Sequence, residues 1–453
     1  MKLAFPKSAE PARRVARRLR DAGGDAVLIG GCVRDLCLEK EPADYDVATS
    51  LPPDQVLTLF PNAIETGRSF GVIRVRTQGT EIEVATFRCD GPYSDGRRPD
   101  SVTFTTLEND IHRRDFTVNA LAANPETGDV IDHVGGLEDL KRKIIRTVGD
   151  PRRRFSEDRL RLIRAVRFAH TLKFSIEEET FRALEEMAPS INDVAAERLF
   201  IELTKILTSP PAGDGVALLD KAGLLEPLLP EITALKNLPQ PEEFHPEGDV
   251  FVHTLLTLNA LKDAPSAAVA WAALLHDIGK PGTFEKRDRI RFHGHAELGA
   301  RMSRRIARRF RMSRALEDRI HIIILEHQKF ADVDRMRPGR LMNWAGREHF
   351  RDLLEVHRAD CVASHGDLSA FETSCRVLRE IERIKALPPR AVTGHTLIRL
   401  GLTPGPAFSE ILRRCYEAQL EGLFSTEESA VIFLREEILP EIEKKTKRKM
   451  VEV

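Results

Sequence analysis

Two aspartates separated by one residue lie close to the start of the chain. Asp44 and Asp46 end the stretch GGCVRDLCLEKEPADYD, which begins at Gly30. Side chains alternate along a strand, so an extended backbone turns both carboxylates toward the same face. Two carboxylates on one face can hold two divalent cations about 4 Å apart, and hard oxygen ligands favour Mg²⁺. We therefore predict a magnesium site at these two aspartates.

The residues before the aspartates are suited to a phosphate chain. Gly30 and Gly31 let the backbone approach a phosphate closely, and the amides exposed there can bind it. Arg34 adds a planar set of hydrogen-bond donors. A DxD pair alone is more often a turn, but after GG-x-V-R-D at this spacing it indicates nucleotidyl transfer. In that reaction one metal lowers the pKa of an attacking hydroxyl and another neutralises the leaving pyrophosphate.

A third carboxylate for the same metals is expected on a neighbouring strand. Glu83 lies between Ile82 and Val84, so alternation along a strand turns it away from both. It is a candidate third catalytic residue beside Asp44 and Asp46. An ordinary exposed glutamate on a strand fits the same pattern.

A second polar cluster, DIHRRDFTVNAL, begins an apolar segment. Arg113 and Arg114 carry donors that fit a triphosphate, whereas Asp115 can accept a hydrogen bond from a ribose hydroxyl. Asn119 follows four residues later and is included among the nucleotide-binding candidates. The alternative is a surface turn stabilised by ion pairs.

A third cluster, SEDRLRLIRAVRF, has helical spacing, and Ser156 is its expected N-cap. Asp158 and Arg161 are three residues apart and therefore neighbours on one helix, so an ordinary ion pair is one interpretation. Contact with a base edge is the other. An acceptor beside a donor matches cytosine and adenine, whereas uracil and guanine present a carbonyl where aspartate needs a donor. Arg164 and Arg167 follow at helical spacing, toward the same groove.

Histidines and carboxylates recur through residues 253 to 365. The segments are HTLLTLNAL, LLHDIGKP, FHGHAELGA, ILEHQKF and HRADCVASH. Imidazole and carboxylate groups suit a divalent transition metal such as Ni²⁺, Co²⁺ or Mn²⁺. The predicted metal ligands are His253, His276, Asp277 and Asp360. The alternative is a helical module that supports RNA and whose metal site is vestigial.

Elements of two kinds must position these residues. Helical and strand-like patterns are mixed up to about residue 150, and helical patterns follow almost to the end. Proline-rich joints near residues 210, 240 and 390 suggest boundaries. We therefore predict an α+β protein, in which a mixed α/β part with a small sheet and helices is followed by all-α regions.

Composition narrows the class of protein further. The chain has 453 residues, enough for about three domains. Its net charge of −1 hides basic runs at residues 141–173 and 301–320 and in the final KKTKRK, and such runs attract polyanions, although a solvated arginine-rich surface is the alternative. The six cysteines form no CxxC pair, which favours free thiols and a cytoplasmic location. No apolar run of about 18 residues is present, so no membrane span is expected.

The first three clusters together resemble the class II tRNA nucleotidyltransferases, the family of CCA-adding enzymes and bacterial poly(A) polymerases. The matching pieces occur in family order: LIGGCVRD with DYD, RRDFTVNAL, EDRLRLIRAVRFA and, more weakly, AAERLFIEL. The one small departure is LCLEKEP in place of the more usual leucine-glycine. The resemblance implies Asp44 and Asp46 as metal ligands, Arg114 on the phosphates, Asp115 on the ribose, and Asp158 with Arg161 as the template for the base.

The histidine segments resemble an HD phosphohydrolase domain. The resemblance implies phosphodiesterase or phosphatase action on 2′,3′-cyclic and 2′-phosphates, with His295 and His327 as candidates for a second metal or the phosphate. With the family's architecture, the expected divisions are a head at 1–150, a neck and body at 151–235, the HD domain at 236–390 and a helical tail at 391–453. Nothing in the sequence selects an oligomeric state.

The family resemblance implies ATP and CTP as substrates and the tRNA 3′ end as partner. In the family, a flexible basic loop before the RRDFT motif is needed to switch from C to A. Here that loop is FRCDGPYSDGRRPDSV, with Arg88, Arg97 and Arg98, which favours addition of the full CCA sequence. Poly(A) synthesis, CC-only or A-only addition, and a tRNA chaperone with inactive sites are the alternatives.

Overall fold

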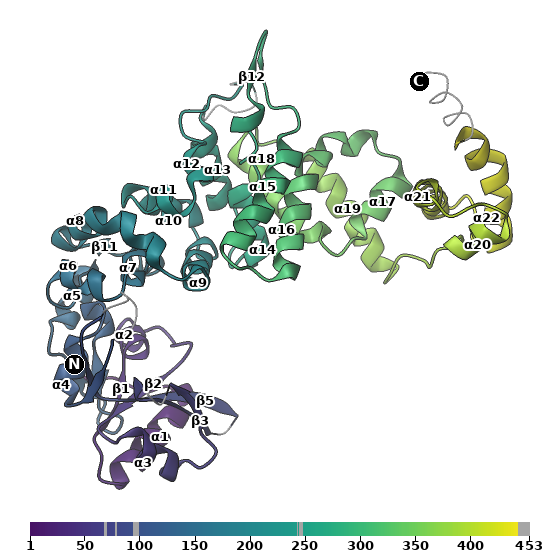
Figure 1. Ribbon diagram of the computed structural model, residues 1–453. Coiled ribbons are helices and arrows are strands. Elements are labelled where there is room, and N and C mark those ends of the chain that lie inside the picture. Colours follow the sequence, from purple (N-terminus) through teal and green to yellow (C-terminus); the bar gives the residue numbers. More distant parts are fainter. Residues whose placement is uncertain (68–69, 78, 94–98, 242, 244–247, 443–453) are drawn as a thin grey trace. The chain divides into compact units, whose positions relative to one another are not determined.

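The chain folds into two compact units, Met1–Thr233 with Arg309–Arg311 and Ala234–Arg308 with Met312–Val453. The computed structural model describes residues 1–67, 70–77, 79–93, 99–241, 243 and 248–442. Figure 1 shows the main sheet in the first unit, followed by helices through the rest of the chain. The α+β class expected from the sequence is confirmed, with two-residue strand pairs as the only strands among the described residues after position 142.

A seven-stranded sheet forms the centre of the first unit, in the order β3-β4-β5-β2-β1-β8-β9. The strands are β1 (Ala26–Ile29), β2 (Asp46–Thr49), β3 (Ile64–Gly67), β4 (Val72–Thr77), β5 (Thr80–Thr86), β8 (Ala122–Ala123) and β9 (Val130–Ile131). The pair β2 and β5 is parallel, and the other neighbouring strands are antiparallel. A separate hairpin joins β6 (Arg88–Asp90) to β7 (Val102–Phe104).

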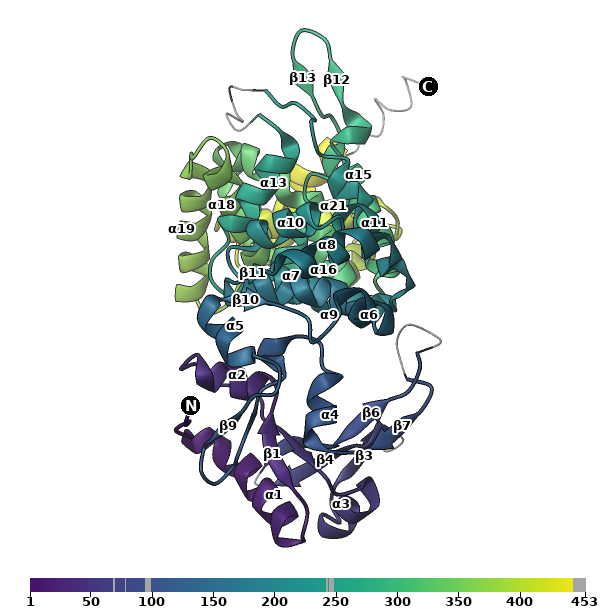
Figure 2. The same ribbon diagram turned by 90° about the vertical axis from the view of Figure 1, so that its left-hand side faces the viewer.

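Amphipathic helices cover the sheet. Helix α1 (Glu10–Asp21) packs against β1 and β2 (Figure 2). Its buried residues include Val15 and Leu19. The chain leaves this helix through Gly23, whose φ of +88° favours glycine. The other helices here are α2 (Gly31–Cys37), α3 (Pro53–Leu59), α4 (Leu107–His112) and α5 (Gly136–Arg142).

The remainder of the first unit is helical. Its helices are α6 (Pro151–Glu157), α7 (Leu160–Leu172), α8 (Glu178–Met187), α9 (Ala196–Leu207), α10 (Ala212–Lys221), α11 (Leu225–Leu228) and α12 (Pro230–Thr233). A parallel pair of two-residue strands, β10 (Ile144–Ile145) and β11 (Ser175–Ile176), connects this helical part to the residues that follow α5. Helix α7 packs against α9 and α10 through buried apolar residues such as Leu162 and Val166.

The second unit contains two groups of helices. One surrounds the almost wholly buried α14 (Ala267–Leu275), which packs against α13, α16 and α18. The other has a core cluster of its own, with Leu397, Ile411 and Ala430 among its buried residues. The other helices are α13 (Val250–Asn259), α15 (His295–Arg309), α16 (Arg314–Glu326), α17 (Pro338–Ala345), α18 (Phe350–Ala363), α19 (Ser369–Arg383), α20 (Gly394–Arg399), α21 (Ala407–Leu420) and α22 (Glu427–Phe433). One short hairpin, β12 (Glu285–Lys286) with β13 (Ile290–Arg291), projects from this helical unit (Figures 1 and 2). Within the described part of the chain, no helix combines the length and apolarity needed to cross a membrane.

Candidate functional site

A cleft of about 370 Å³ in the first unit gathers most of the predicted nucleotide-site residues. It opens between the strands β2 and β5 and the residues around the start of α7. Its polar lining consists of Asp46, Glu83, Arg88, Arg113, Arg114, Asp115, Asp158, Arg161, Arg164 and Arg198. Carboxylates and guanidinium groups therefore share one small volume, as a site for a metal-bound triphosphate requires.

The carboxylates Asp46 and Glu83 lie opposite each other on the parallel strands β2 and β5. Glu83 is exposed whereas Ile82 and Val84 are buried, so the predicted orientation of Glu83 is confirmed. Burial raises the pKa of Asp46 to about 6, and the negative charges of Glu83 and Asp44 add to the shift, against the effect of Arg114. Negative charge therefore accumulates at this end of the cleft, and a divalent cation would relieve it.

The expectation that Asp44 and Asp46 share a strand is wrong. Asp46 is the first residue of β2, and Asp44 is exposed and precedes the strand. The reason lies in the partner: β1 has only four residues and ends at Ile29, which pairs with Asp46, before the chain turns at Gly30. Asp44 is still close enough to affect the pKa of Asp46. The two carboxylates therefore adjoin without the strand alternation that the sequence suggested.

The glycine turn before α2 has one conformationally demanding position. Gly30 has φ of +85°, and a Cβ there would lie 3.2 Å from Nη1 of Arg114. Gly31 begins α2, and a Cβ built there would make only an ordinary contact, 3.7 Å from Arg34 Nη2. Close approach of the backbone to the cleft arginine is thus a property of Gly30, and phosphate contact by Gly31 stays a prediction.

Arg34 and Asn119 are bonded to each other and do not line the cleft. Arg34, which is buried, donates from Nη1 to Oδ1 of Asn119 at 2.6 Å and from Nε to Asp35 at 2.8 Å. Asn119 in turn donates from Nδ2 to Oδ1 of Asp115 at 3.3 Å. The geometry gives both residues a part in holding Asp115, and their direct contact with a nucleotide stays a prediction.

Asp115 is held ionised at the cleft by Arg164. Arg164 donates to its Oδ2 from Nε at 2.9 Å and from Nη2 at 2.5 Å. Burial alone would raise the pKa of Asp115, but the charge and hydrogen bonds of Arg164 outweigh burial and lower the pKa to about 2. Asp115 is therefore a permanent acceptor near neutral pH, which suits a ligand hydroxyl.

The expected helical pair of Asp158 and Arg161 is wrong. Asp158 is extended, with φ of −142°, because it lies between α6 and α7, and it accepts hydrogen bonds from Arg198 of α9 at 2.8 and 3.1 Å. Arg161 instead pairs with Glu157 at 2.9 Å and donates to the carbonyl oxygen of Arg113 at 2.9 Å. Both side chains line the cleft, but from different elements.

The N-cap expected at Ser156 is also wrong, because Asp150 caps α6 by accepting from the backbone N–H of Arg153 at 2.7 Å. Ser156 lies inside α6 and donates to the carbonyl oxygen of Arg153. Helix α6 begins at Pro151, whose fixed φ is favourable at a first helical position. The segment expected to be one helix from Ser156 onward therefore contains the end of α6 and all of the residues that begin α7.

Two further arginines differ in their access to the cleft. Arg114 lines it and pairs with Asp110 at 3.2 Å, and its buried Nε has no hydrogen-bond partner among the described residues. Arg167 does not line it: it pairs with Glu202 of α9 and lies over the ring of Phe168 at 3.7 Å. Phosphate binding therefore fits Arg114, whereas Arg167 has the contacts of a packing residue.

Arg198 is the functional candidate that the sequence reading missed. It lies in the segment AAERLFIEL, which carried the weakest part of the resemblance, and it fixes both oxygens of Asp158. The segment itself was the available signal. Of the basic-loop residues, Arg88 lines the cleft and bonds Asp90 at 2.9 Å, whereas Arg97 and Arg98 lie outside the described residues.

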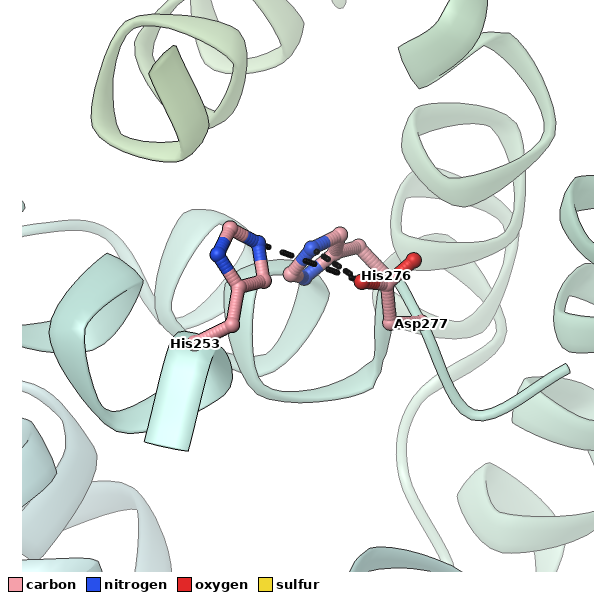
Figure 3. Close-up of side chains that lie close together, drawn as sticks. All are labelled: His253, His276 and Asp277. Atoms are coloured by element: carbon pink, nitrogen blue, oxygen red, sulfur yellow. Dashed lines mark ion pairs between the residues drawn. The ribbon is translucent and has the colours of Figure 1, made fainter. Parts of the chain in front are cut away.

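A second constellation lies in the second unit, where α13, α14 and α18 bring histidines and carboxylates together. His253 and His276 both direct Nε2 toward Oδ2 of Asp277, at 3.9 and 3.2 Å (Figure 3). Asp360 completes the set with Oδ1 at 3.0 Å from His253 Nε2. All four predicted metal ligands therefore meet, although α13 and α18 are about a hundred residues apart in the chain.

Two more histidines face Asp277 from the other side. His295 Nε2 lies 3.4 Å from its Oδ1, and His327 Nε2 lies 3.3 Å from His295 Nε2. Ligand atoms of Asp277, His295 and His327 come close enough together for one ion, as do those of His253, His276 and Asp277. Asp277 belongs to both groups, so its two oxygens can serve two adjacent positions.

The donor chemistry of this centre fits a divalent transition metal. His276, His295 and His327 each place Nδ1 within 2.8 Å of a backbone carbonyl oxygen three residues earlier, so Nδ1 carries the proton and Nε2 offers a lone pair. Burial, followed by the neighbouring histidines, lowers the pKa of His327 to about 3, which keeps it neutral. Nε2 of His276 is buried without a hydrogen-bond partner in the described structure, whereas Oδ2 of Asp277 lies 2.7 Å from Nζ of Lys280. A buried imidazole nitrogen with no partner suits metal coordination.

Comparison with protein families gives three matches along the chain. The model described as poly A polymerase head domain matches residues 26–146. The model described as probable RNA and SrmB-binding site of polymerase A matches residues 173–236. The HD domain model matches residues 250–364. The cleft carboxylates Asp46 and Glu83 fall in the first match and Arg198 in the second, whereas Asp158, Arg161 and Arg164 lie between the two matches. The histidine cluster (His253, His276, Asp277, His295, His327 and Asp360) falls in the third match.

Curated relatives carry the name CCA-adding enzyme. One from Limosilactobacillus reuteri (strain DSM 20016) is 46% identical over 212 residues, which is 46% of this chain and 52% of the relative. The chain therefore aligns with about half the length of the first such relatives. The protein from Limosilactobacillus fermentum (strain NBRC 3956 / LMG 18251) is 31% identical over 436 residues, 96% of this chain and 98% of its own.

Solved structures agree with that alignment along the whole chain. The CCA-adding enzyme of Bacillus stearothermophilus in complex with CTP superposes with a TM-score of 0.74 and 29% identity, covering 98% of this chain and all of the other. A Thermotoga maritima CCA-adding enzyme complexed with tRNA shares the fold at a TM-score of 0.60 and 19% identity, covering 95% of each chain. With near full-length alignment to a relative of over 30% identity, the chain belongs to the family of the CCA-adding enzymes.

Proposed function

We propose that this protein adds C, C and A to the 3′ end of tRNA, taking CTP and ATP as substrates. The observation that carries the proposal is the cleft in which Asp46 and Glu83 lie with Arg114, Asp115 and Asp158. Relatives of this chain bear the name CCA-adding enzyme, and the Bacillus stearothermophilus structure is a complex with CTP. The match to an RNA-binding segment at residues 173–236 supports an RNA substrate.

In this proposal Asp44 and Asp46 hold Mg²⁺, with Glu83 as the third catalytic carboxylate. The raised pKa of Asp46, about 6, reflects burial and uncompensated negative charge that a cation would balance. The metal, when bound, supplies charge that activates the tRNA 3′ hydroxyl and stabilises the leaving pyrophosphate. Arg114, which lines the cleft, contacts the triphosphate, and Asp115, fixed by Arg164, accepts from the ribose.

The base is selected by Asp158 and Arg161 at the end of the cleft that α7 provides. Arg198 fixes the carboxylate of Asp158, so its outward lone pairs are oriented to accept from the amine of cytosine or adenine. The buried Arg161 is anchored by Glu157 and a backbone carbonyl oxygen, which leaves a rigid donor edge. Contact with the nucleotide stays a prediction for Gly31, Arg34, Asn119 and Arg167. Arg34 and Asn119 support the site by holding Asp115, and Arg167 pairs with Glu202.

The product decides between the proposal and its alternatives. The protein is incubated with a tRNA that lacks its 3′ end, with CTP alone, ATP alone and both, and the products are sequenced. Full CCA ends with both nucleotides confirm the proposal. Addition that stops at CC, a single A on a CC end only, or long adenosine tails would each replace it with a partial enzyme or a poly(A) polymerase.

We infer further that the histidine cluster is a metal-dependent phosphohydrolase that acts on 2′,3′-cyclic or 2′-phosphates. His253, His276, Asp277 and Asp360 would hold Ni²⁺, Co²⁺ or Mn²⁺, and His295 and His327 a second ion or the phosphate. A bound ion supplies an activated water and polarises the phosphate. Two observations carry this inference: the ligand atoms of these residues converge in two groups that could each hold an ion, and the buried Nε2 of His276 has no hydrogen-bond partner among the described residues. Hydrolysis of a 2′,3′-cyclic nucleotide by metal-loaded protein, abolished by a chelator, tests it.

A further inference from the structure

A hairpin in the second unit begins and ends at the histidine cluster. The chain passes from Asp277 through the β12–β13 hairpin to His295, and strand pairing joins Glu285 to Arg291 and Lys286 to Ile290. The hairpin stands away from the helices of its unit (Figures 1 and 2). Asp277 and His295, two members of the histidine cluster, therefore lie on either side of the hairpin in the chain, while the tip of the hairpin is exposed to solvent.

Aromatic side chains form the base of the hairpin beside the metal centre. The rings of Phe284 and Phe292 are 5.9 Å apart, and Phe292 lies 6.5 Å from the ring of His295. Nζ of Lys280 is 5.3 Å from the centroid of Phe292 and 2.7 Å from Oδ2 of Asp277. Both phenylalanines are only partly buried. A nucleobase can therefore stack at the hairpin base while its phosphate is near the cluster.

The tip of the hairpin is basic. Residues 285–291 contain four basic and two acidic side chains. The acidic ones are paired within the hairpin, Glu285 with Arg287 at 3.3 Å and Asp288 with Arg291 at 2.8 Å. Lys286 and Arg289 are both exposed and are not part of these two pairs. Phosphates that approach the tip therefore meet two positive charges not neutralised by those pairs.

We propose that the β12–β13 hairpin binds the single-stranded 3′ end of an RNA, so that the histidine cluster acts on polynucleotide ends in preference to mononucleotides. The proposal rests on the hydrolase inferred above and names its substrate class. The terminal base stacks on Phe284 and Phe292, and the preceding phosphates reach Lys286 and Arg289. The backbone from Phe292 to Arg289 extends about 10 Å, so the preceding phosphates of a polynucleotide follow the hairpin toward its tip while the terminal base stays at its base.

The reaction at such an end is a simple hydrolysis. Water forms a bond to phosphorus, one P–O bond of the 2′,3′-cyclic ester breaks, and the proton of the water passes to the released ribose oxygen. No oxidant or further substrate is needed. The hairpin takes no part in the bond changes, so its residues contribute to binding of the polynucleotide and leave the rate for a saturating mononucleotide unchanged.

The test compares a short RNA ending in a 2′,3′-cyclic phosphate with adenosine 2′,3′-cyclic phosphate, using the full-length protein loaded with Ni²⁺ or Mn²⁺. Wild-type protein should have the higher kcat/KM on the RNA. Lys286→Glu with Arg289→Glu should lower kcat/KM on the RNA by about tenfold or more and leave the mononucleotide value unchanged. Phe284→Ala should lower kcat/KM on the RNA by a similar factor. Phe284→Trp retains a stacking surface and should keep kcat/KM on the RNA near the wild-type value.

A matched control carries the same charge change elsewhere in the unit. Arg376→Glu with Arg379→Glu alters two exposed arginines of α19, and we expect no change on either substrate. Equal kcat/KM for both substrates in the wild type would overturn the proposal. An equal loss of kcat/KM on both substrates in the Lys286→Glu, Arg289→Glu variant would overturn it as well.

Crosslinking tests the hairpin without hydrolysis. A short RNA with 4-thiouridine as its last nucleotide is irradiated with the protein, and the modified peptide is identified. We expect crosslinks within residues 281–294, lost in the Lys286→Glu, Arg289→Glu variant. Crosslinks only elsewhere would overturn the hairpin proposal. If the wild type hydrolyses neither substrate but crosslinks at the hairpin, the hydrolase inference fails and RNA binding by the hairpin stands.

Discussion

Asp46 and Glu83 are register partners on the only parallel strand pair of the seven-stranded sheet among the described residues. Neighbouring positions on adjacent strands bring the two carboxylates together, and Glu83 is the largest of the neighbouring charges that raise the pKa of Asp46. Parallel pairing thus supplies a charge arrangement that Asp44 and Asp46 alone do not. Positive charge from a metal would stabilise both carboxylates at once.

Replacing Asp46 by alanine should abolish nucleotide addition and leave tRNA affinity nearly unchanged. Phosphoryl transfer depends on metal charge, whereas RNA binding rests on basic side chains spread over much larger surfaces. Addition should fall by about 100-fold or more, since a metal supplies several kcal/mol of transition-state stabilisation. Single-turnover incorporation of labelled CTP and filter binding of tRNA measure the two quantities. Residual addition above a few per cent in both Asp46→Ala and Asp44→Ala would contradict the metal assignment.

Glu83→Gln separates a catalytic carboxylate from an ordinary exposed glutamate. If Glu83 is the third catalytic carboxylate, the variant should lose addition nearly as severely as Asp46→Ala and should need a higher Mg²⁺ concentration for half-maximal rate. Glu81→Gln is the matched control, because Glu81 lies two residues away on β5 and pairs with Arg74 and Arg76. A Glu83 variant that behaves like the control would remove Glu83 from the site.

Asp158→Ala should lower addition of C and A and raise incorporation of U or G relative to C. The carboxylate accepts from the correct amine and repels a carbonyl, so one residue carries both effects. A mismatched edge costs about 1–3 kcal/mol, or roughly tenfold to a hundredfold in preference. The structure adds a second variant: Arg198→Ala releases Asp158 and should reduce the same selectivity while leaving the acceptor present. Single-nucleotide incorporation with each NTP gives the ratios, and an unchanged C-over-U ratio in Asp158→Ala would make it a structural residue.

Short-range patterns in the sequence predicted the face of a strand on which a side chain lies better than they predicted its hydrogen-bond partners. The orientation of Glu83 followed from simple alternation and is confirmed. The predicted pair of Asp158 and Arg161 is wrong because the spacing of apolar residues does not show that one helix ends before Asp158 and another begins after it. The partner of Asp158 is Arg198, forty residues away in the chain. Asp44 lies outside β2 because the length of β2 is set by its partner β1. Tertiary contacts decide these features.

The histidine cluster was easier to predict because its chemistry is carried by unusual residue types. Buried histidines beside aspartates have few structural uses, so their recurrence pointed to one centre although the ligands come from separate helices. The sequence did not reveal that Nδ1 of His276 and His327 faces a carbonyl oxygen and so directs Nε2 inward. The orientation of each ring depends on the position of the backbone carbonyl oxygen three residues earlier, which the sequence does not give.

His276→Ala with Asp277→Ala should remove metal-dependent hydrolysis of 2′,3′-cyclic phosphates and spare CCA addition. The two constellations are formed by different compact units, so loss of one leaves the residues of the other in place. A control, His395→Ala, changes an exposed histidine of α20 and should leave both activities intact. Bound Ni²⁺ or Co²⁺ is measured by elemental analysis alongside activity. Hydrolysis that persists in the double variant would place the activity elsewhere.

Asp115→Asn should destabilise the first unit near neutral pH, and the effect should shrink in acid. The folded-state pKa of Asp115 is about 2, below its ordinary 3.8, so the carboxylate stabilises the fold fully above pH 3.8 and loses this contribution as the pH falls toward 2. The shift corresponds to about 2 kcal/mol.

Both tryptophans, Trp271 and Trp344, lie in the second unit, so their fluorescence reports that unit, whereas far-UV circular dichroism reports both. In urea titrations at pH 7, the variant should shift a transition seen by circular dichroism and leave the fluorescence transition in place. Asp21→Asn, at the exposed end of α1, should shift neither by more than about 0.5 kcal/mol. A deficit for Asp115→Asn that is as large at pH 3 as at pH 7 would show that its cost is loss of packing and not loss of the charge held by Arg164.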